Sequence, residues 1–339
     1  MMRKIRLGLG YAGVFVIALQ LPHLLSTSML VAASESLVFA VAGLSVVIIS
    51  GWTGQTSLAQ VSLMGVAAYV LALLMGPDAG FPLYAAAPLA ILAACTASVV
   101  IGLPALRVRG VYLAIVTLAF AQAIYDAVFL SSRVTHGEVS DGLALPRPTL
   151  GALDLRSDRT MYYLILGTLV VCCGVVALLR NSSLGRRMIA VRATEIGSSG
   201  RGVSVTVVKL LAFVVSAGFA GLAGCLLALY LQSVGPSNFD PLQSIFLLGV
   251  VVVCGGRTVG AAIAGGALYG SMPVVLSRLF GTGSEFGLNA PHLIVGIGVV
   301  SALLGHELLK RHPITLPGQR LAWWGSRALK KEGLTDVAA

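Results

Sequence analysis

The chain is poor in charged residues. Asp, Glu, Lys and Arg make up only 11% of its 339 residues, whereas apolar residues make up 57% and the mean hydropathy is +0.93. A typical soluble domain contains about 25% charged residues. The composition therefore excludes an ordinary soluble domain, and we expect an all-α protein that crosses the membrane several times.

Motifs for catalysis and energy transduction are also missing. The sequence contains no G-x-x-x-x-G-K-[ST] phosphate-binding loop, no H-E-x-x-H motif and no Cys/His metal cluster. Its five Cys lie in apolar runs, so we interpret them as small core residues. Ser57 has no His or Lys at a suitable depth to act as its base, so an intramembrane serine protease fits the sequence poorly. We predict no enzyme activity and no cofactor in this chain.

Charges within the apolar runs are scarce. Only Glu35 and Asp126 come near the interior of a predicted span, and both are placed close to its outer end. Charged side chains inside a membrane usually mark ion or proton paths, and a proton-coupled carrier would be expected to contain more of them. If the chain moves a solute uphill, we expect another chain to supply the energy.

Ten runs are long enough to span a bilayer, which takes about 20 mainly apolar residues. They are residues 7–25, 33–50, 57–76, 83–103, 111–130, 160–179, 209–231, 242–256, 258–280 and 290–307. With both termini in the cytoplasm, 18 of the 23 Lys and Arg fall on the cytoplasmic side, as the positive-inside rule requires. This bias also explains the net charge of +10, so nucleic acid is not an expected partner. We predict a transmembrane domain over residues 1–309 and a basic cytoplasmic tail over 310–339.

Two loops are long, an outer loop at 131–159 and an inner loop at 180–208. Within the inner loop, the pattern over 184–196 predicts a short amphipathic helix with Asn181, Ser182 or Ser183 as its N-cap. Its apolar positions are Leu184, Met188, Ile189 and Val191, and its charged positions are Arg186, Arg187, Arg192 and Glu195. Such a helix either lies on anionic lipid headgroups or docks onto a cytoplasmic protein.

The stretch GWTGQTSLAQ, residues 51–60, separates two apolar runs and carries no charge. It is either a tight turn at the membrane interface or a polar break held among the helices. In the second case Thr53, Gln55, Ser57 and Gln60 line a polar path. A different pattern, small residues at four-residue spacing between Ala212 and Ala228, predicts close helix packing.

Four blocks of the chain resemble, in the same order, the permease subunits of ABC importers for branched-chain amino acids, a family that includes urea and short-amide permeases. The blocks are GWTGQTSLAQVSLMGVAAYV, LPALRVRGVYLAIVTLAFAQ, the run from SLGRRMIAVRATEIG to LAGCLLALY, and FDPLQSIFLLGVVVVCGGRTVGAAIAGGALY. They cover most of residues 36–275. Two positions depart from the family pattern: Ala59 and Gln60 replace a Gly-His pair, and Arg257-Thr258 interrupt a Gly-rich loop.

The resemblance implies a non-catalytic transport subunit in the bacterial cytoplasmic (inner) membrane. Its implied partners are a second permease chain, two ATP-binding subunits that carry ATP and Mg²⁺, an extracytoplasmic solute-binding protein, the small-molecule substrate and membrane lipid. The substrate path is expected at Thr53, Gly54, Gln55, Ser57 and Gln60, and the coupling to the ATPase at Arg186, Arg187, Arg192 and Glu195. A urea or amide importer and an ATP-independent carrier are the alternatives.

Overall fold

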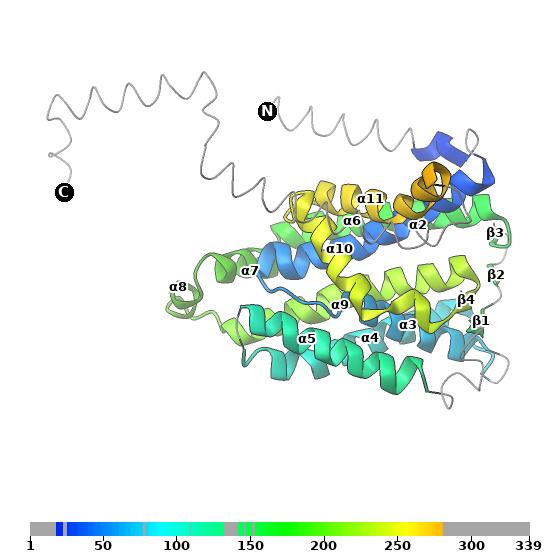
Figure 1. Ribbon diagram of the computed structural model, residues 1–339. Coiled ribbons are helices and arrows are strands. Elements are labelled where there is room, and N and C mark those ends of the chain that lie inside the picture. Colours follow the sequence, from blue (N-terminus) through cyan, green and yellow to red (C-terminus); the bar gives the residue numbers. More distant parts are fainter. Residues whose placement is uncertain are drawn as a thin grey trace, which may run out of the picture. The chain divides into compact units, whose positions relative to one another are not determined.

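Long apolar helices form most of the described chain (Figure 1). The computed structural model describes residues 18–22, 26–76, 79–108, 110–131, 142–145, 147–150 and 153–280. The long helices are α2 (Thr27–Val46), α3 (Gln60–Met75), α4 (Leu83–Ala105), α5 (Val111–Ile124), α6 (Asp158–Asn181), α9 (Val205–Leu231), α10 (Pro241–Val253) and α11 (Val259–Phe280). Two π-helical stretches, η1 (Val47–Trp52) and η2 (Tyr125–Phe129), extend α2 and α5.

These helices confirm that the chain is a helical membrane protein. Six of the described helical segments are long and apolar enough to cross a bilayer, and α3 and α11 add shorter apolar helices. Eight of the ten predicted spans coincide with described helices. Residues 18–22, at the end of the predicted span 7–25, are helical. The rest of that span, the span 290–307 and the tail 310–339 lie outside the described residues, so the number ten stays a prediction.

The connections between the helices gather at two ends of the bundle. The inner loop forms two short helices, α7 (Ser183–Ala193) and α8 (Glu195–Ser199), at the left in Figure 1. The turns at 106–110 and 254–258 lie at this same end, which we call the α7 end. The opposite end, at the right in Figure 1, carries the strands β1 to β4 and is called the strand end. The described loops that the positive-inside rule places on the cytoplasmic side therefore lie at one end of the bundle.

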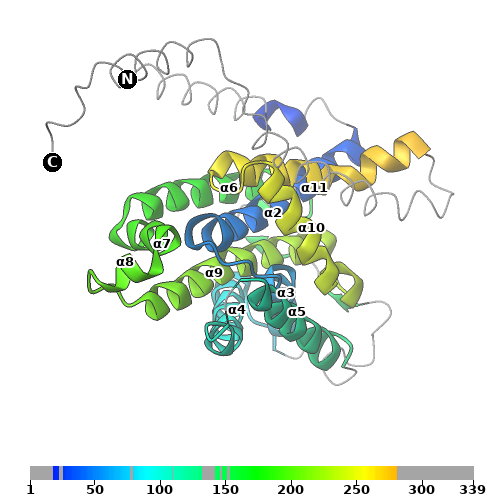
Figure 2. The same ribbon diagram turned by 60° about the vertical axis from the view of Figure 1, so that its left-hand side comes forward.

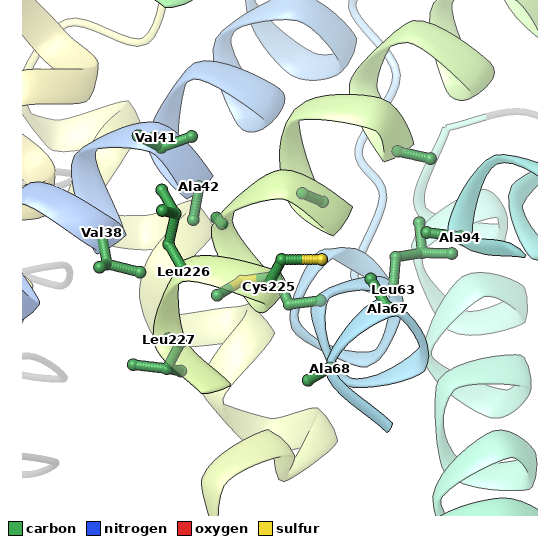
Figure 3. Packing of buried hydrophobic residues seen from close by; sticks show 14 of the residues in the cluster. Val38, Val41, Ala42, Leu63, Ala67, Ala68, Ala94, Cys225, Leu226 and Leu227 are labelled. Carbon is green, nitrogen blue, oxygen red and sulfur yellow. The ribbon is translucent and has the colours of Figure 1, made fainter. Parts of the chain in front are cut away.

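Helix α9 is the centre of the packing. It contacts α2, α3 and α4, and it lies among them in both ribbon views (Figures 1 and 2). In Figure 3, side chains of α9 lie between those of α2 and those of α3; the labelled ones are Cys225, Leu226 and Leu227 of α9, Val38, Val41 and Ala42 of α2, and Leu63, Ala67 and Ala68 of α3. A Cβ added at Gly224 would lie 2.0 Å from the carbonyl oxygen of Met64. The small residues of α9 thus serve the predicted close packing.

The predicted outer loop folds back onto α9. Strand β1 (Leu143–Ala144) pairs with β4 (Ser233–Val234), and β2 (Thr149–Leu150) pairs with β3 (Leu153–Asp154). The buried Arg147 lies between β1 and β2 in the sequence. It donates hydrogen bonds to the carbonyl oxygens of Leu229 (3.1 Å) and Tyr230 (2.8 Å) at the end of α9 and forms an ion pair with Asp158. A cation suits this position, because the last carbonyls of a helix lack partners within it.

The amphipathic helix of the inner loop is confirmed with a corrected end. Ser182, one of the three predicted N-caps, accepts a hydrogen bond from the backbone N–H of Gly185 at 3.2 Å. The helix ends at Ala193 and not at residue 196, because Thr194 is extended (φ −153°, ψ 121°) and starts a separate short helix. Of its apolar positions, Met188 and Val191 are buried, whereas Ile189 is exposed.

Candidate functional site

The chain between Trp52 and Gln60 leaves the helical conformation inside the bundle. Residues 54–59 have no regular secondary structure, and Gly54 has φ +72°, a left-handed conformation that glycine adopts without strain. Helix α3 starts only at Gln60, and its 16 residues span about 24 Å, less than the hydrocarbon thickness of about 30 Å. We call residues 53–59 the break. This crossing of the bundle is therefore part irregular chain and part helix.

Hydroxyl groups of other helices satisfy backbone groups in and beside the break. The N–H of Leu58 donates to Thr117 Oγ1 of α5, and the N–H of Val61 donates to Ser244 Oγ of α10, each at 3.0 Å. Both hydroxyls are buried. Non-helical chain is tolerated at membrane depth only where protein or an aqueous cavity supplies its hydrogen bonds. The break meets that condition through contacts with neighbouring helices.

Gln60, at the start of α3, joins three helices. Its side chain is 1% exposed, and its Oε1 accepts hydrogen bonds from Ser45 of α2 (2.9 Å) and Ser216 of α9 (3.1 Å). Ser216 lies near the middle of α9, so the end of the break is deep in the bundle. The Nε2 group of Gln60 is buried and has no hydrogen-bond partner among the described residues.

The other predicted path residues lie at the start of the break. Thr53, Gln55 and Ser57 are buried, and Gly54 is exposed. The backbone of Gln55 is held from both sides: its N–H donates to Ile49 O at 3.2 Å, and its carbonyl accepts from Ser50 Oγ at 3.0 Å. Its side-chain Oε1 is buried and has no partner in the described part of the chain. The first half of the break is therefore bonded to η1, whereas Leu58 and, just beyond the break, Gln60 are bonded by other helices.

A small pocket of about 70 Å³ lies beside the break at the α7 end. One side of its lining consists of Thr53, Gly54, Gln55, Thr56, Glu195 and Lys209. The other side consists of Ala105, Leu106, Val108, Gly110 and Leu113. Lys209 Nζ and Glu195 Oε1 form an ion pair of 2.6 Å in this lining. The start of the break is therefore accessible from the α7 end next to a pair of opposite charges.

The four predicted coupling residues divide into two groups. Arg186 and Arg187 are exposed, and Arg186 donates to the carbonyl oxygen of Asn181. Glu195 faces Lys209, and Arg192 turns toward the break, where its Nη1 donates to Ser50 O (2.8 Å) and to Gly51 O. Burial and the nearby positive charge of Arg257 lower the pKa of Arg192. Two of the four predicted residues, Arg192 and Glu195, thus contact residues distant in the sequence, whereas Arg186 bonds only a nearby carbonyl.

Sequence reasoning missed the partners of the break. The sequence predicted no role for the hydroxyls of Ser45, Thr117 and Ser244. Ser216 was included only among the small residues between Ala212 and Ala228 that predict close helix packing. One signal was available, because hydroxyl residues in apolar helices commonly bond across to other helices. This pattern predicts that each hydroxyl bonds a group on another helix, but it does not identify that group.

The chain matches a known protein family. Residues 28–304 match the family described as the permease component of branched-chain amino acid transport systems. The chain belongs to this family. Membership makes it a multi-pass protein of the bacterial cytoplasmic (inner) membrane, as predicted.

Two curated relatives carry the same description, "High-affinity branched-chain amino acid transport system permease protein LivM", one from Salmonella typhimurium and one from Escherichia coli. Each is 31% identical to the chain over 264 residues, which is 71% of this chain and 61% of the relative. The chain therefore spans less than two thirds of the length of these relatives. A solved structure, PsaBC from Streptococcus pneumoniae in complex with Fab, is 15% identical over 86% of this chain and 94% of that chain, with a TM-score of 0.45 that is too low to carry an argument.

Proposed function

We propose that the chain is the permease subunit of an ATP-driven importer for branched-chain or related amino acids. It provides a solute path, and partner chains hydrolyse ATP. The observation that carries the proposal is the break, an uncharged and largely buried polar segment in a family member. Hydroxyls of α5 and α10 bond the chain at Leu58 and, just beyond the break, at Val61. In other transporters, interrupted helices supply the backbone and side-chain groups that meet the solute.

The chemistry of the break suits a small zwitterionic or neutral solute. Within the described part of the chain, Gln55 Oε1 is an acceptor and Gln60 Nε2 a donor without a partner, and both atoms are buried. Unpaired buried polar groups cost about 1–3 kcal/mol each, so a passing solute or water that bonds them is favoured. The charged pair Lys209 and Glu195 lies outside the break, beside the pocket at the α7 end. A neutral solute such as urea or a short amide fits the same groups and is the second candidate.

The exposed surface of α7 and α8 is the proposed docking site for an ATP-binding subunit. It presents the cations Arg186 and Arg187 together with Ile189 and Ile196, the latter 88% exposed. An apolar centre with a charged rim is typical of protein interfaces. In the proposed topology the α7 end faces the cytoplasm, in line with the positive-inside rule. Arg192 and Glu195 hold this surface to the bundle from within.

The test is reconstitution. The chain is purified with its second permease chain and ATP-binding subunits, placed in liposomes, and assayed with the solute-binding protein for uptake of labelled leucine and, separately, of urea. We expect ATP-dependent leucine uptake. Uptake by this chain alone without ATP would identify a secondary carrier instead, and uptake of urea but not leucine would favour the second candidate.

A variant of the break tests the path itself. Gln55→Leu keeps the side-chain volume and removes the unpaired acceptor, so we expect uptake to be lost while the subunits still purify together. Gly54→Leu is a less specific probe, because any side chain at φ +72° is strained. Thr96→Val is the matched control, because Thr96 is a polar residue on the exposed face of α4 whose hydroxyl bonds only its own helix. Normal uptake by Gln55→Leu would remove Gln55 from the path.

A further inference from the structure

Arg192 bonds the proposed docking helix to η1, the helical turn that precedes the break. Arg192 lies in the last turn of α7, and its Nη1 donates to the carbonyl oxygens of Ser50 and Gly51 in η1. We propose that Arg192 is a positioning residue that transmits movement of α7 to the break. This inference rests on the proposed function, since it assigns a route from the docked ATPase to the solute path.

The acceptors explain why a cation is held there. The last carbonyls of a helix have no partner within it and carry the negative end of its dipole. Here α2 and η1 end at Trp52, and the carbonyls of Ser50 and Gly51 point to Arg192. Hydrogen bonds to a guanidinium are charge-assisted and about twice as strong as neutral ones. Within the described residues, Arg192 hydrogen-bonds these two carbonyls and no carboxylate.

The same turn of η1 is fixed on its other side. A Cβ added at Gly51 would lie 2.2 Å from the carbonyl oxygen of Gly256, so only glycine permits this approach. Trp52 Nε1 donates to the carbonyl oxygen of Arg257 at 3.4 Å. The end of η1 is thus held between α7 and the turn at 254–258. A shift of α7 relative to that turn therefore acts directly on η1.

One hydrogen bond and one packing contact carry the effect onward into the break. Ser50, whose carbonyl binds Arg192, donates its hydroxyl to the carbonyl of Gln55 at 3.0 Å. The aliphatic stem of Arg192 packs against Gly54, where an added Cβ would lie 3.2 Å from Arg192 Cγ. A hydrogen bond of 2.8 Å weakens strongly when its atoms separate by another ångström. A displacement of α7 that keeps these bonds therefore carries Ser50 with it, and through the Ser50 hydroxyl it moves Gln55.

The experiment uses the complete complex and separates hydrolysis from uptake. Arg192→Met keeps the stem that packs against Gly54 and removes the donor, whereas Arg192→Lys keeps a cation that can reach a carbonyl. Arg201→Met is the control, since Arg201 is an exposed cation in the same loop. Three quantities are measured for each variant: co-purification of the ATP-binding subunits, ATP hydrolysis with binding protein and leucine, and leucine uptake.

We expect Arg192→Met to assemble and to hydrolyse ATP. The amount of ATP consumed per leucine should rise about tenfold or more, because the variant loses both charge-assisted hydrogen bonds of Arg192. Arg192→Lys should restore part of the wild-type ratio, and Arg201→Met should keep it. A wild-type ratio in Arg192→Met overturns the inference. So does a parallel loss of co-purification and hydrolysis, which would make Arg192 a docking or folding residue.

A second variant covers failure of Arg192→Met to fold. Gly54→Ala leaves the guanidinium in place, but its methyl group would lie 3.2 Å from the Arg192 stem and strains the backbone at φ +72°, so it should also raise the ATP consumed per leucine. An unchanged ratio in an assembled Gly54→Ala complex counts against the link. Failure of the proposed function has a different signature, because then the wild-type complex itself shows no ATP-dependent uptake.

Discussion

The side chain of Gln60 accepts a hydrogen bond from Ser216 at 3.1 Å, and the same Oε1 accepts one from Ser45 at 2.9 Å. Each serine also lies within bonding distance of a backbone acceptor, Ala42 O at 2.6 Å for Ser45 and Ser45 O at 3.0 Å for Ser216. A hydroxyl has one proton to donate. The junction of α2, α3 and α9 can therefore exchange Gln60 for backbone acceptors without losing a hydrogen bond on either serine.

We predict that Gln60→Leu changes stability little but impairs transport. The serines keep their backbone acceptors, and the variant removes the unpaired Nε2, so the free energy of unfolding should fall by about 1 kcal/mol or less. Uptake should nevertheless be lost, because the break loses its polar contact with α9. Thermal unfolding in detergent and leucine uptake measure the two effects. Gln60→His, which introduces the residue of the family motif and a ring nitrogen as acceptor, should retain uptake; a fully active Gln60→Leu variant contradicts the prediction.

Thr117→Val should destabilise the protein by about 1–3 kcal/mol. The substitution conserves shape but leaves the N–H of Leu58 without its acceptor inside the bundle. Thr117→Ser keeps the hydroxyl and is the matched control. Thermal unfolding of both variants in the same detergent gives the comparison, and equal stability of the two would show that water or another group satisfies Leu58.

Gly224→Ala should be among the most damaging single-methyl substitutions in α9. The new Cβ would lie 2.0 Å from the carbonyl oxygen of Met64, so α3 and α9 must separate. Overpacking of this kind typically costs about 1–3 kcal/mol and sometimes more. Gly218→Ala, on the same helix, meets only Cys95 Sγ at 3.7 Å and should be tolerated. Expression level and thermal unfolding distinguish them, and similar stability of the two variants would count against the close approach.

The docking surface is tested with two substitutions, one that reverses the charge of an exposed cation and one that places a charge at an exposed apolar residue. Arg187→Glu combined with Ile196→Asp should reduce co-purification of the ATP-binding subunits about tenfold or more, because both exposed side chains belong to the proposed interface. Arg159→Glu, an exposed cation in the first turn of α6 at the strand end, should leave co-purification unchanged. Undiminished co-purification of the double variant would place the ATPase elsewhere.

Much of the helical framework could be predicted from the sequence, because the length of an apolar run is a local property. The end of α7 could not be predicted in this way, because it depends on a contact outside the run itself. Thr194 is extended next to Glu195, and Glu195 pairs with Lys209, 14 residues further along the chain. No local pattern contains that contact.

In the break, too, local properties could be predicted from the sequence and distant contacts could not. Its polarity and lack of charge are visible in GWTGQTSLAQ. The positive φ of Gly54 is not, since Gly51 in the same stretch does not share it. Its depth is not visible, since it depends on hydroxyls from distant helices. Arg192 was predicted among the docking residues because its charge lies on an amphipathic helix, but the structure turns it toward Ser50 and Gly51.

The distant partners of the break also set an order of assembly. Ser216 and Ser244, which bond Gln60 and the N–H of Val61, follow them by 156 and 183 residues. During synthesis the ribosome completes α3 long before either hydroxyl exists, so nascent chain with residues 53–61 has no such partners to bond. We expect this segment to stay hydrated at the insertion machinery until α9 and α10 emerge, and the crossing that carries the break to be among the last to settle in the bilayer.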